Sequence, residues 1–286
     1  MSARKSEWKW SCLVLLTVIG GAQIEMISAA ELKRETLKAW SDYVHATECR
    51  IGRELAQGDR FLVLDFQDPK AAAGERGAML SGGIPAAKIE SRGSNGVKIG
   101  IPDGMIHHWR GGIFIPDVDL NLVLARVENP VPGEIKQEDV LKSAVLDRGN
   151  GYLKLYLKLQ RSKIVTVVYN TVHEVRYQRQ PRDRAWSSSK TLKIAELSHP
   201  NSPEEREKPE GRDHGFLWRL NSYWRYEQTD GGVIVECESI SLSRSIPSLL
   251  EFMVRPIIDR VARESMERTL SSLRERILRS KIKNPV

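Results

Sequence analysis

Few side chains in this chain of 286 residues have both the type and the spacing that catalysis or metal binding needs. His45 and Cys49 are four residues apart, as metal ligands on one face of a helix can be, but no further ligand pairs with them at a recognisable spacing. His107 and His108 are adjacent, so on a strand their side chains point to opposite faces. Only one of these two histidines can therefore serve a given cavity. We expect no metal and no cofactor.

The common motifs of nucleophilic and nucleotide chemistry are missing from the sequence. It contains no Gly-x-Ser-x-Gly elbow, no phosphate-cradling glycine loop and no dinucleotide-binding fingerprint. General acid–base catalysis can depend on only a few acid and base side chains, and His173 and Glu238 are the candidates for it. The sequence thus favours a protein that is not an enzyme and leaves catalysis as the alternative.

The N-terminal residues 1–30 have the pattern of a secretory signal peptide. A basic start is followed by an apolar run over Cys12–Ile24 and by a small-residue cleavage site that ends at Ala30. The apolar run is shorter than the ~20 residues that span a bilayer, which argues against a stable anchor. We expect cleavage near Ala30 and a protein exported to the periplasm or the extracellular space.

The composition of the whole chain is that of a globular protein, with 41% hydrophobic and 28% charged residues. The net charge of +7 is spread thinly among acidic residues, so it favours transient contact with an anionic membrane surface only weakly and predicts no nucleic-acid binding. Cys49 and Cys237 both follow the expected cleavage site. A disulfide between them is one interpretation, and two small buried residues are the other.

Residues 31–103 are expected to form an N-terminal extension without a clear core of its own. Apolar residues at three- to four-residue steps predict a helix over Glu31–Leu55. Phe61–Phe66 is expected to be a short strand and Ala71–Gly77 a loose connection. Met79–Ile89 is expected to be a further strand, which its glycines and proline weaken.

A different pattern begins at Met105. A strand over Met105–Ile115 leads into a helix that Asp117 or Asp119 can cap, and a short acidic turn leads to Asp139. Apolar alternation and turn residues then predict six strands, the last two joined by a hairpin turn, before a long helix that begins near Pro247. These strands are Val140–Leu146, Tyr152–Gln160, Lys163–Gln178, Trp186–Leu197, Gly215–Gln228 and Val233–Ser243.

The order of strand, helix, short helix, six strands and long helix resembles the helix-grip fold of the START and Bet v 1-like (SRPBCC) superfamily, which includes polyketide cyclases and lipid-transfer domains. It is also similar to uncharacterised exported bacterial members of that superfamily. The resemblance covers residues 105–280 and is carried by Trp109–Pro116, Asp119, Trp218–Glu227, Asp230-Gly231-Gly232, Val235–Arg244, Pro247, Arg263-Glu264-Ser265 and Thr269-Leu270.

This resemblance implies an α+β fold in which a curved antiparallel sheet wraps around the C-terminal helix. Folds of this kind usually keep a cavity between sheet and helix, which holds sterols, phospholipids, fatty acids or aromatic polyketides. We accordingly divide the chain into a signal peptide (1–30), an N-terminal extension of a helix and short strands (31–103) and a START-like domain (104–286).

The register of the last hairpin predicts which side chains line such a cavity. A turn at Thr229–Gly232 puts aromatic and small residues on one face and charged residues on the other. The first face pairs Tyr226 with Val235, Trp224 with Cys237, Ser222 with Ser239 and Leu220 with Ser241, while the second pairs Arg225 with Glu236 and Tyr223 with Glu238.

Since buried unpaired charges are costly, the first face is expected to look toward the helix. The candidate ligand-binding residues are therefore Tyr169, His173, Trp218, Ser222, Trp224, Ser239, Ser241, Met253 and Ile257. Inward aromatic residues can equally be core. A register slipped by one residue would exchange the faces, and the N-terminal extension could bury the charged face as well.

Pro256 lies inside the expected terminal helix and would kink it. The kink could let the first turns gate a cavity, or it could simply follow the curvature of the sheet. We expect an exported protein that binds or carries a hydrophobic ligand, namely a lipid, sterol-like or polyketide-like molecule. The alternatives are a cyclase- or hydrolase-like enzyme in the same cavity, or a structural or interaction protein whose cavity is filled.

Overall fold

The computed structural model describes residues 31–130, 139–162 and 166–283. The expected signal peptide and the short helix before Asp139 lie outside these residues. An antiparallel sheet forms the centre, with strands in the order β1-β2-β9-β8-β6-β5-β4-β3 and with β7 paired to β6. The strands are β1 Ala86–Lys88, β2 Gly104–Pro116, β3 Val140–Gly149, β4 Tyr152–Ser162, β5 Thr166–Gln180, β6 Arg184–Ser198, β7 Arg206–Glu207, β8 Arg219–Thr229 and β9 Gly232–Arg244.

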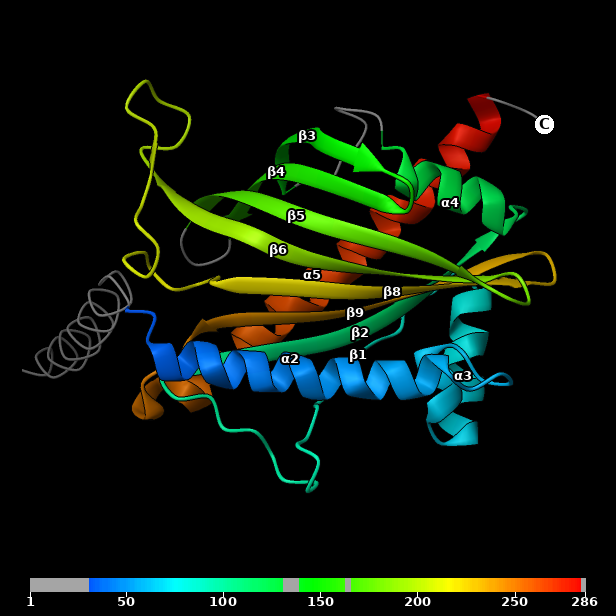
Figure 1. Cartoon of the computed structure of the whole chain (residues 1–286), viewed down its shortest axis with the longest axis horizontal. Coiled ribbons are helices and arrows are strands. Elements are labelled where there is room, and N and C mark those ends of the chain that lie inside the picture. Colours follow the sequence, from blue (N-terminus) through cyan, green and yellow to red (C-terminus); the bar gives the residue numbers. More distant parts are fainter. Residues whose placement is uncertain (1–30, 131–138, 163–165, 284–286) are drawn as a thin grey trace, which may run out of the picture.

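Helices lie on both faces of this curved sheet (Figure 1). Helix α5 (Ser248–Lys283) crosses one face diagonally, and helix α2 (Arg34–Leu55) runs along the other. We call these the α5 face and the α2 face. Along β2, the odd-numbered residues 107–113 lie on the α5 face and the even-numbered residues 108–114 on the α2 face. A sheet wrapped around a long terminal helix is the α+β helix-grip fold that the sequence predicts.

Two adjacent glycines let both layers approach β2 closely. A Cβ atom at Gly111 would lie 3.0 Å from side-chain atoms of both Leu270 and Met266 of α5. A Cβ atom at Gly112 would lie 2.5 Å from the sulfur of Met79, which belongs to helix α3 (Pro69–Leu80) on the α2 face. The missing side chains thus allow packing from opposite sides at one point of the strand.

The main apolar core lies between the α5 face and α5. Helix α4 (Leu120–Glu128) closes one end of it, and Asp119 caps that helix by accepting a hydrogen bond of 2.7 Å from the Leu122 N–H. The strands contribute Ile113, Ile115, Val233 and Val235, and the helices contribute Val123, Leu124, Met266, Leu270, Leu273 and Ile277. This burial fixes the second half of α5 to the sheet.

The N-terminal extension differs from the sequence prediction in three places. The expected connection at 71–77 is part of helix α3, because Asp68 accepts from the N–H groups of Lys70 and Ala71 and Pro69 stands at the first helical position. The expected strand at 79–89 shortens to β1. The expected strand at 61–66 is instead the 3₁₀ helix η1 (Val63–Phe66). The Asp65 carboxylate accepts hydrogen bonds from the N–H groups of Phe61 and Leu62, which stabilises a turn instead of a strand.

The hairpin register is confirmed at every predicted pair. Tyr226 lies opposite Val235 and Ser222 opposite Ser239, whereas Arg225 lies opposite Glu236. Aromatic and small residues occupy the α5 face, and the charged residues are buried under the N-terminal helices. Both faces of the hairpin are therefore covered, and a one-residue slip would bring charges against α5.

Helix α5 continues through Pro256 without a break. Its first turns are less covered than its second half, since Phe252 is 76% exposed and Met253 and Ile257 are also exposed. Among the described residues, no helix combines the length and the apolar character that a membrane span requires.

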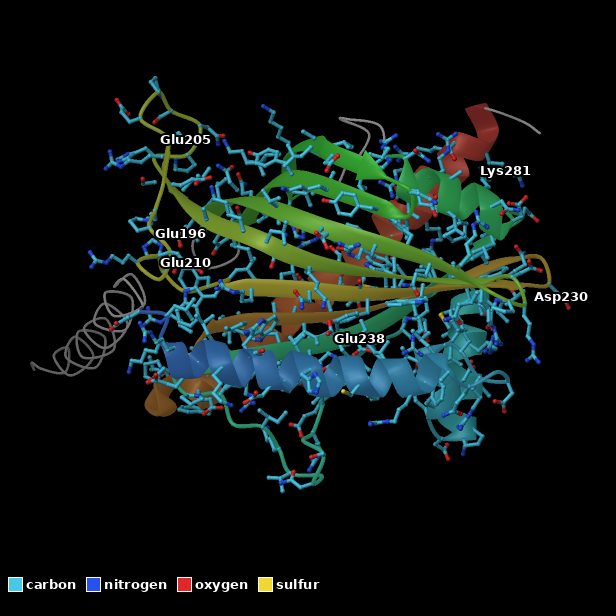
Figure 2. All side chains as sticks on the ribbon, viewed as in Figure 1. Glu196, Glu205, Glu210, Asp230, Glu238 and Lys281 are labelled. Atoms are coloured by element: carbon cyan, nitrogen blue, oxygen red, sulfur yellow. The ribbon has the colours of Figure 1, made fainter. Side chains whose placement is uncertain are left out.

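The polar loop after β6 folds back on the end of the sheet, where Figure 2 shows Glu196, Glu205 and Glu210. Glu196 is 1% exposed and accepts hydrogen bonds from Lys208 Nζ at 2.5 Å and from the His214 N–H at 3.0 Å. The loop is thus anchored by a buried carboxylate, while most of its residues between 199 and 212 are exposed.

Candidate ligand-binding cavity

A cavity of about 270 Å³ lies between the α5 face of strands β4, β5, β6 and β8 and residues 269–276 of α5. One wall is a row of four leucines from β4, and another is made of small hydroxyl residues from β6 and β8. The leucines are Leu153, Leu155, Leu157 and Leu159; the serines are Ser187, Ser189 and Ser222. The cavity is therefore apolar along one side and mildly polar along the other.

Strict alternation along β4 creates the leucine wall. Odd-numbered residues point to the α5 face, while Lys154, Tyr156 and Lys158 point away from it. Tyr156 donates a hydrogen bond of 2.7 Å to Asn170, and Lys158 pairs with Glu205, so the opposite side of the strand is polar. A single strand thus supplies a continuous apolar surface without exposing a second one to water.

A row of adjacent serines provides the space. Ser189 of β6 lies opposite Ser222 of β8, which lies opposite Ser239 of β9. Val175 and Trp109 flank this row on the neighbouring strands. Three small side chains side by side leave a trough that larger residues would fill, because interiors otherwise pack densely.

His173 is a titratable group in the cavity wall. It is buried, and its Nε2 lies 2.9 Å from the Thr171 hydroxyl. Burial lowers the pKa of His173 to about 4, so the ring is neutral at physiological pH. It can then form a hydrogen bond with a ligand but offers no positive charge.

The two candidates for acid–base catalysis lie on opposite faces of the sheet. His173 lines the cavity, whereas Glu238 lies on the α2 face and pairs with Arg50 of α2. The adjacent histidines are separated in the same way, with His107 on the α5 face beside Ser243 and His108 on the α2 face beside Tyr43. A shared catalytic site of His173 and Glu238 is therefore excluded by their placement.

Of the nine predicted ligand-binding residues, the structure brings His173, Ser222 and Trp224 into the cavity wall. Ser239 and Ser241 lie on the same face one strand further. Their role in binding stays a prediction. Tyr169 also lies on this face, buried beside the end of the leucine row.

Three predicted residues lie elsewhere. Trp218 precedes β8, packs with Trp40 and Tyr43 under α2, and donates to Asp213 at 2.9 Å. The alternation along β8 would place even-numbered residues on the α5 face, but this rule does not reach Trp218, because the pairing of β8 begins only at residue 219. Met253 and Ile257 lie on exposed turns of α5, since the helix contacts the cavity through its second half.

Sequence reasoning did not assign the β4 leucines or the β6 serines to the cavity. The β4 alternation was visible, but only the pairing of Leu155 with His173 shows that it shares a face with the cavity. Arg161 continues the same row and also lines the cavity. Its odd number on the same strand was the available signal.

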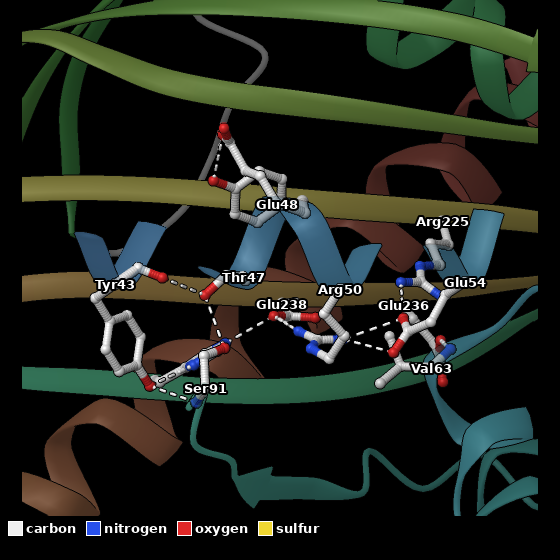
Figure 3. A network of polar contacts seen from close by, with 12 residues as sticks. Tyr43, Thr47, Glu48, Arg50, Glu54, Val63, Ser91, Arg225, Glu236 and Glu238 are labelled. Atoms are coloured by element: carbon white, nitrogen blue, oxygen red, sulfur yellow. Dashed lines mark hydrogen bonds and ion pairs between the residues drawn. The ribbon is translucent and has the colours of Figure 1, made fainter. Parts of the chain in front are cut away.

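On the α2 face, a buried polar network joins α2 and η1 to the hairpin (Figure 3). The Arg50 guanidinium bridges Glu54 and Glu238, and the His108 ring lies between Glu238 (2.7 Å) and Tyr43 (2.9 Å). The Tyr43 hydroxyl accepts from the Ser91 N–H, which leaves its proton for His108 Nδ1.

A second half of the network centres on Arg225 and Glu236. Arg225 donates to Glu54 at 2.5 Å and to the Phe61 carbonyl at 2.7 Å. Glu236 accepts from the N–H groups of Val63 and Leu64. The charged face of the hairpin is therefore a docking surface for the N-terminal extension rather than a solvated surface.

The pKa values of the two buried glutamates of β9 are shifted in opposite directions. Burial raises the pKa of Glu236 to about 7, although Arg225 and the two backbone N–H groups act against it. Burial also acts to raise the pKa of Glu238, but the His108 hydrogen bond, Arg50 and Arg225 together lower it below its ordinary value. Glu238 thus stays ionised at neutral pH, while burial favours the protonated form of Glu236.

Neither Cys49 nor Cys237 forms a disulfide. Cys49 is exposed on α2 and Cys237 is buried on the α5 face, so the sheet separates them. Cys49 Sγ lies 3.5 Å from His45 Nε2, but no group of three or more His, Cys, Asp or Glu side chains that could hold a metal occurs in the described ranges.

Solved structures are similar to this chain at low sequence identity. A STAR-related lipid transfer protein from Xanthomonas axonopodis matches with 15% identity and a TM-score of 0.44, over 68% of this chain and 98% of that one. An aromatase/cyclase from a Streptomyces species matches with 10% identity and a TM-score of 0.41, over 62% and 96%. A START superfamily protein from Mycobacterium smegmatis matches with 8% identity and a TM-score of 0.35, over 62% and 98%.

No protein-family model matches the sequence, and neither does any curated protein. The helix-grip architecture expected from the sequence is present in the strand order and in the long terminal helix α5 of this chain.

Proposed function

We propose that this protein binds a hydrophobic small molecule or lipid in the cavity beneath α5 and carries it without chemical change. The observation that carries the proposal is the juxtaposition of the β4 leucine row with the trough of small residues on β6 and β8. Apolar walls stabilise an apolar ligand through the area they remove from water. A few hydroxyl groups then orient it.

The lining favours binding over catalysis. No carboxylate is among the described residues that line the cavity, and its histidine is neutral and paired with a threonine. General acid–base catalysis needs groups whose pKa lies near the working pH, and His173 at about 4 is not such a group. The volume of about 270 Å³ lies just below the ~300–1,000 Å³ typical of small-molecule sites, which suits one acyl chain or a compact ring system.

Export belongs to the same proposal. A carrier that shields an apolar ligand suits an aqueous compartment outside the cytoplasm, and the sequence pattern of residues 1–30 supports this location. N-terminal sequencing of the protein purified from its own cells tests it. We expect a first residue close after Ala30; an intact Met1 would contradict export.

Ligand binding is tested by extraction and by filling the trough. Organic extraction and native mass spectrometry of the purified full chain are expected to show a co-purifying apolar molecule. Ser222→Leu and Ser189→Leu place branched side chains in the cavity, and we expect each to weaken binding of the neutral dye Nile red at least about tenfold, which corresponds to ~1.4 kcal/mol.

Ser188→Leu is the matched control. It changes the neighbouring residue of the same strand, whose side chain points to the α2 face and lies opposite Tyr223. Nile red affinity is expected to stay within about twofold in this variant, because the new side chain lies outside the cavity. A twofold difference corresponds to less than ~0.5 kcal/mol. Equal loss in all three variants, or unchanged binding in both cavity variants, would refute the cavity as the site.

A further inference from the structure

One end of the leucine row carries a cluster of charges. Arg161 continues the row on β4, lines the cavity and forms an ion pair with Asp139. Arg268 of α5 approaches the same Asp139 carboxylate at 3.5 Å. Among the described residues, two guanidinium groups therefore share one carboxylate.

Both guanidinium groups are positively charged at neutral pH. Burial and the neighbouring Arg268 lower the pKa of Arg161 to about 10, which still leaves it protonated, and the contact with Asp139 favours the same charged form. The cluster of Arg161, Arg268 and ionised Asp139 thus carries an excess positive charge beside an apolar wall.

Three polar atoms around this cluster are buried without a hydrogen-bond partner among the described residues. They are Asp139 Oδ1, Arg268 Nε and the hydroxyl of Tyr169. Tyr169 is 1% exposed and lies on the same face of the sheet as Arg161, opposite Leu159 of the leucine row. Buried polar groups are normally paired, because leaving one unpaired costs free energy.

Helix α5 brings further polar groups to the cavity wall that lies opposite the leucine row. Arg268, Ser272 and Arg276 follow one another at four-residue steps and so share one face of the helix. Ser272 and Arg276 line the cavity opposite the leucines. Among the described residues that line the cavity, Arg161 therefore lies at the Leu159 end of the leucine row, whereas Arg276 lies near Tyr177 at the other end.

We propose that the ligand is a single-chain amphiphile with an anionic head group, a carboxylate or a phosphate, held by Arg161 and Arg268 while its chain lies along Leu153–Leu159. This inference rests on the proposed function, because it names the ligand class of the same cavity. Guanidinium groups suit both head groups through paired N–H donors.

Competition with Nile red on the full chain tests the inference. The competitors share one chain and differ in the head group: oleate, mono-oleyl phosphate and the neutral oleyl alcohol. We expect at least one of the two anions to bind about tenfold more tightly than the alcohol, as hydrogen bonds to a charged group allow. The tighter of the two anions identifies the head group.

Variants locate the effect. Arg161→Gln and Arg268→Gln are expected to weaken binding of the anion about tenfold and to change oleyl alcohol affinity less than about twofold. Arg263→Gln is the control, since it removes one positive charge from the same helix at a site that is 57% exposed and paired with Glu267. It is expected to leave both affinities unchanged.

The outcomes separate the two proposals. If oleyl alcohol binds as tightly as both anions, or if Arg263→Gln weakens the anion as much as Arg161→Gln does, the anionic head group is refuted while the apolar carrier stands. If none of the three competitors displaces Nile red, both proposals fail. The head-group comparison uses the unaltered chain, so the inference stays testable if Arg161→Gln does not fold.

Discussion

Replacing Arg225 by methionine tests whether the charged face of the hairpin is what holds the N-terminal extension. Arg225 is 3% exposed and donates to Glu54 and to the Phe61 carbonyl, while Glu236 lies opposite it on β9. Arg225→Met keeps a long apolar stem but leaves both acceptors without this donor. Glu54 retains Arg50, and the Phe61 carbonyl loses the charged partner that the guanidinium gave it.

The expected cost follows from these contacts. Each hydrogen bond to a charged group contributes ~1.5–3 kcal/mol, and removing one partner of a buried ion pair typically costs ~3–5 kcal/mol. We therefore expect Arg225→Met to lower the free energy of unfolding by about 3–5 kcal/mol. A domain with a total of ~5–15 kcal/mol would still fold.

Urea denaturation followed by tryptophan fluorescence measures this change, because Trp40 and Trp218 both lie in the cluster beneath α2. Arg176→Met is the control: Arg176 also pairs with a glutamate, but its side chain is 63% exposed, so its loss is expected to cost below ~1 kcal/mol. A cost for Arg225→Met no greater than that of the control would refute the argument.

The effect also has a predicted pH dependence. Without Arg225, the pKa of Glu236, already raised to about 7 by burial, rises further. A carboxyl group with a raised folded-state pKa contributes stability at low pH that is lost as the pH rises through that pKa. The cost of Arg225→Met is therefore expected to be smaller at mildly acidic than at mildly alkaline pH. Adding Glu236→Gln should recover part of the loss at alkaline pH, and a cost that grows on acidification would contradict this.

Three further variants probe the α5 face. Burial lowers the pKa of His173 to about 4, so the stability that the neutral ring contributes is present above the unfolded-state pKa of ~6.5 and is lost as the pH falls. Urea titrations at pH 7 and pH 5 should therefore show that His173 lowers the free energy of unfolding by about 2 kcal/mol between these two values, and His173→Asn should remove this loss. Gly111→Ala should cost ~1–3 kcal/mol because the new Cβ meets Leu270, whereas Gly74→Ala, with open space around it in α3, should be neutral or stabilising, and equal midpoints would refute the close approach. Tyr169→Phe removes a buried hydroxyl without a partner, so in ligand-free protein it should be neutral or stabilising by up to ~1 kcal/mol in thermal melts; a loss above ~1 kcal/mol would show that the hydroxyl is paired.

The sequence was most informative where a short-range rule sets the geometry. The two-residue period of β4 and β8 and the turn at residues 229–232 sufficed for the hairpin register and for the choice of the face that looks toward α5. Local signals were also present at Asp68 and Pro69, which begin α3, but the small residues that follow them suggested a loop. Most of the misassigned segments lie in the extension, where Ala, Gly and Pro obscure the periodicity, whereas in the hairpin the start of β8 moves from the expected residue 215 to residue 219.

The cavity was harder to predict because it depends on distant pairings. Which part of α5 covers the sheet decides that Thr269 and Leu273 line the cavity while Met253 and Ile257 do not. No local pattern distinguishes these two halves of one apolar stripe. The cluster of Arg161, Arg268 and Asp139 likewise joins β4, α5 and the residue before β3, which only the fold brings together.

The network beneath α2 also sets an order of events during synthesis. Arg50 and Glu238 are 188 residues apart in the chain, and Val63 and Glu236 are 173 apart. At ~5–20 residues per second, α2 emerges roughly 10–40 s before the strand that neutralises its buried charges exists. Its face bearing Trp40 and Tyr43 therefore lacks Ile240 and Leu242 of β9 throughout that time. The first helix of the fold is among the last elements that can dock, so a chain truncated before β9 would leave it exposed to chaperones and proteases.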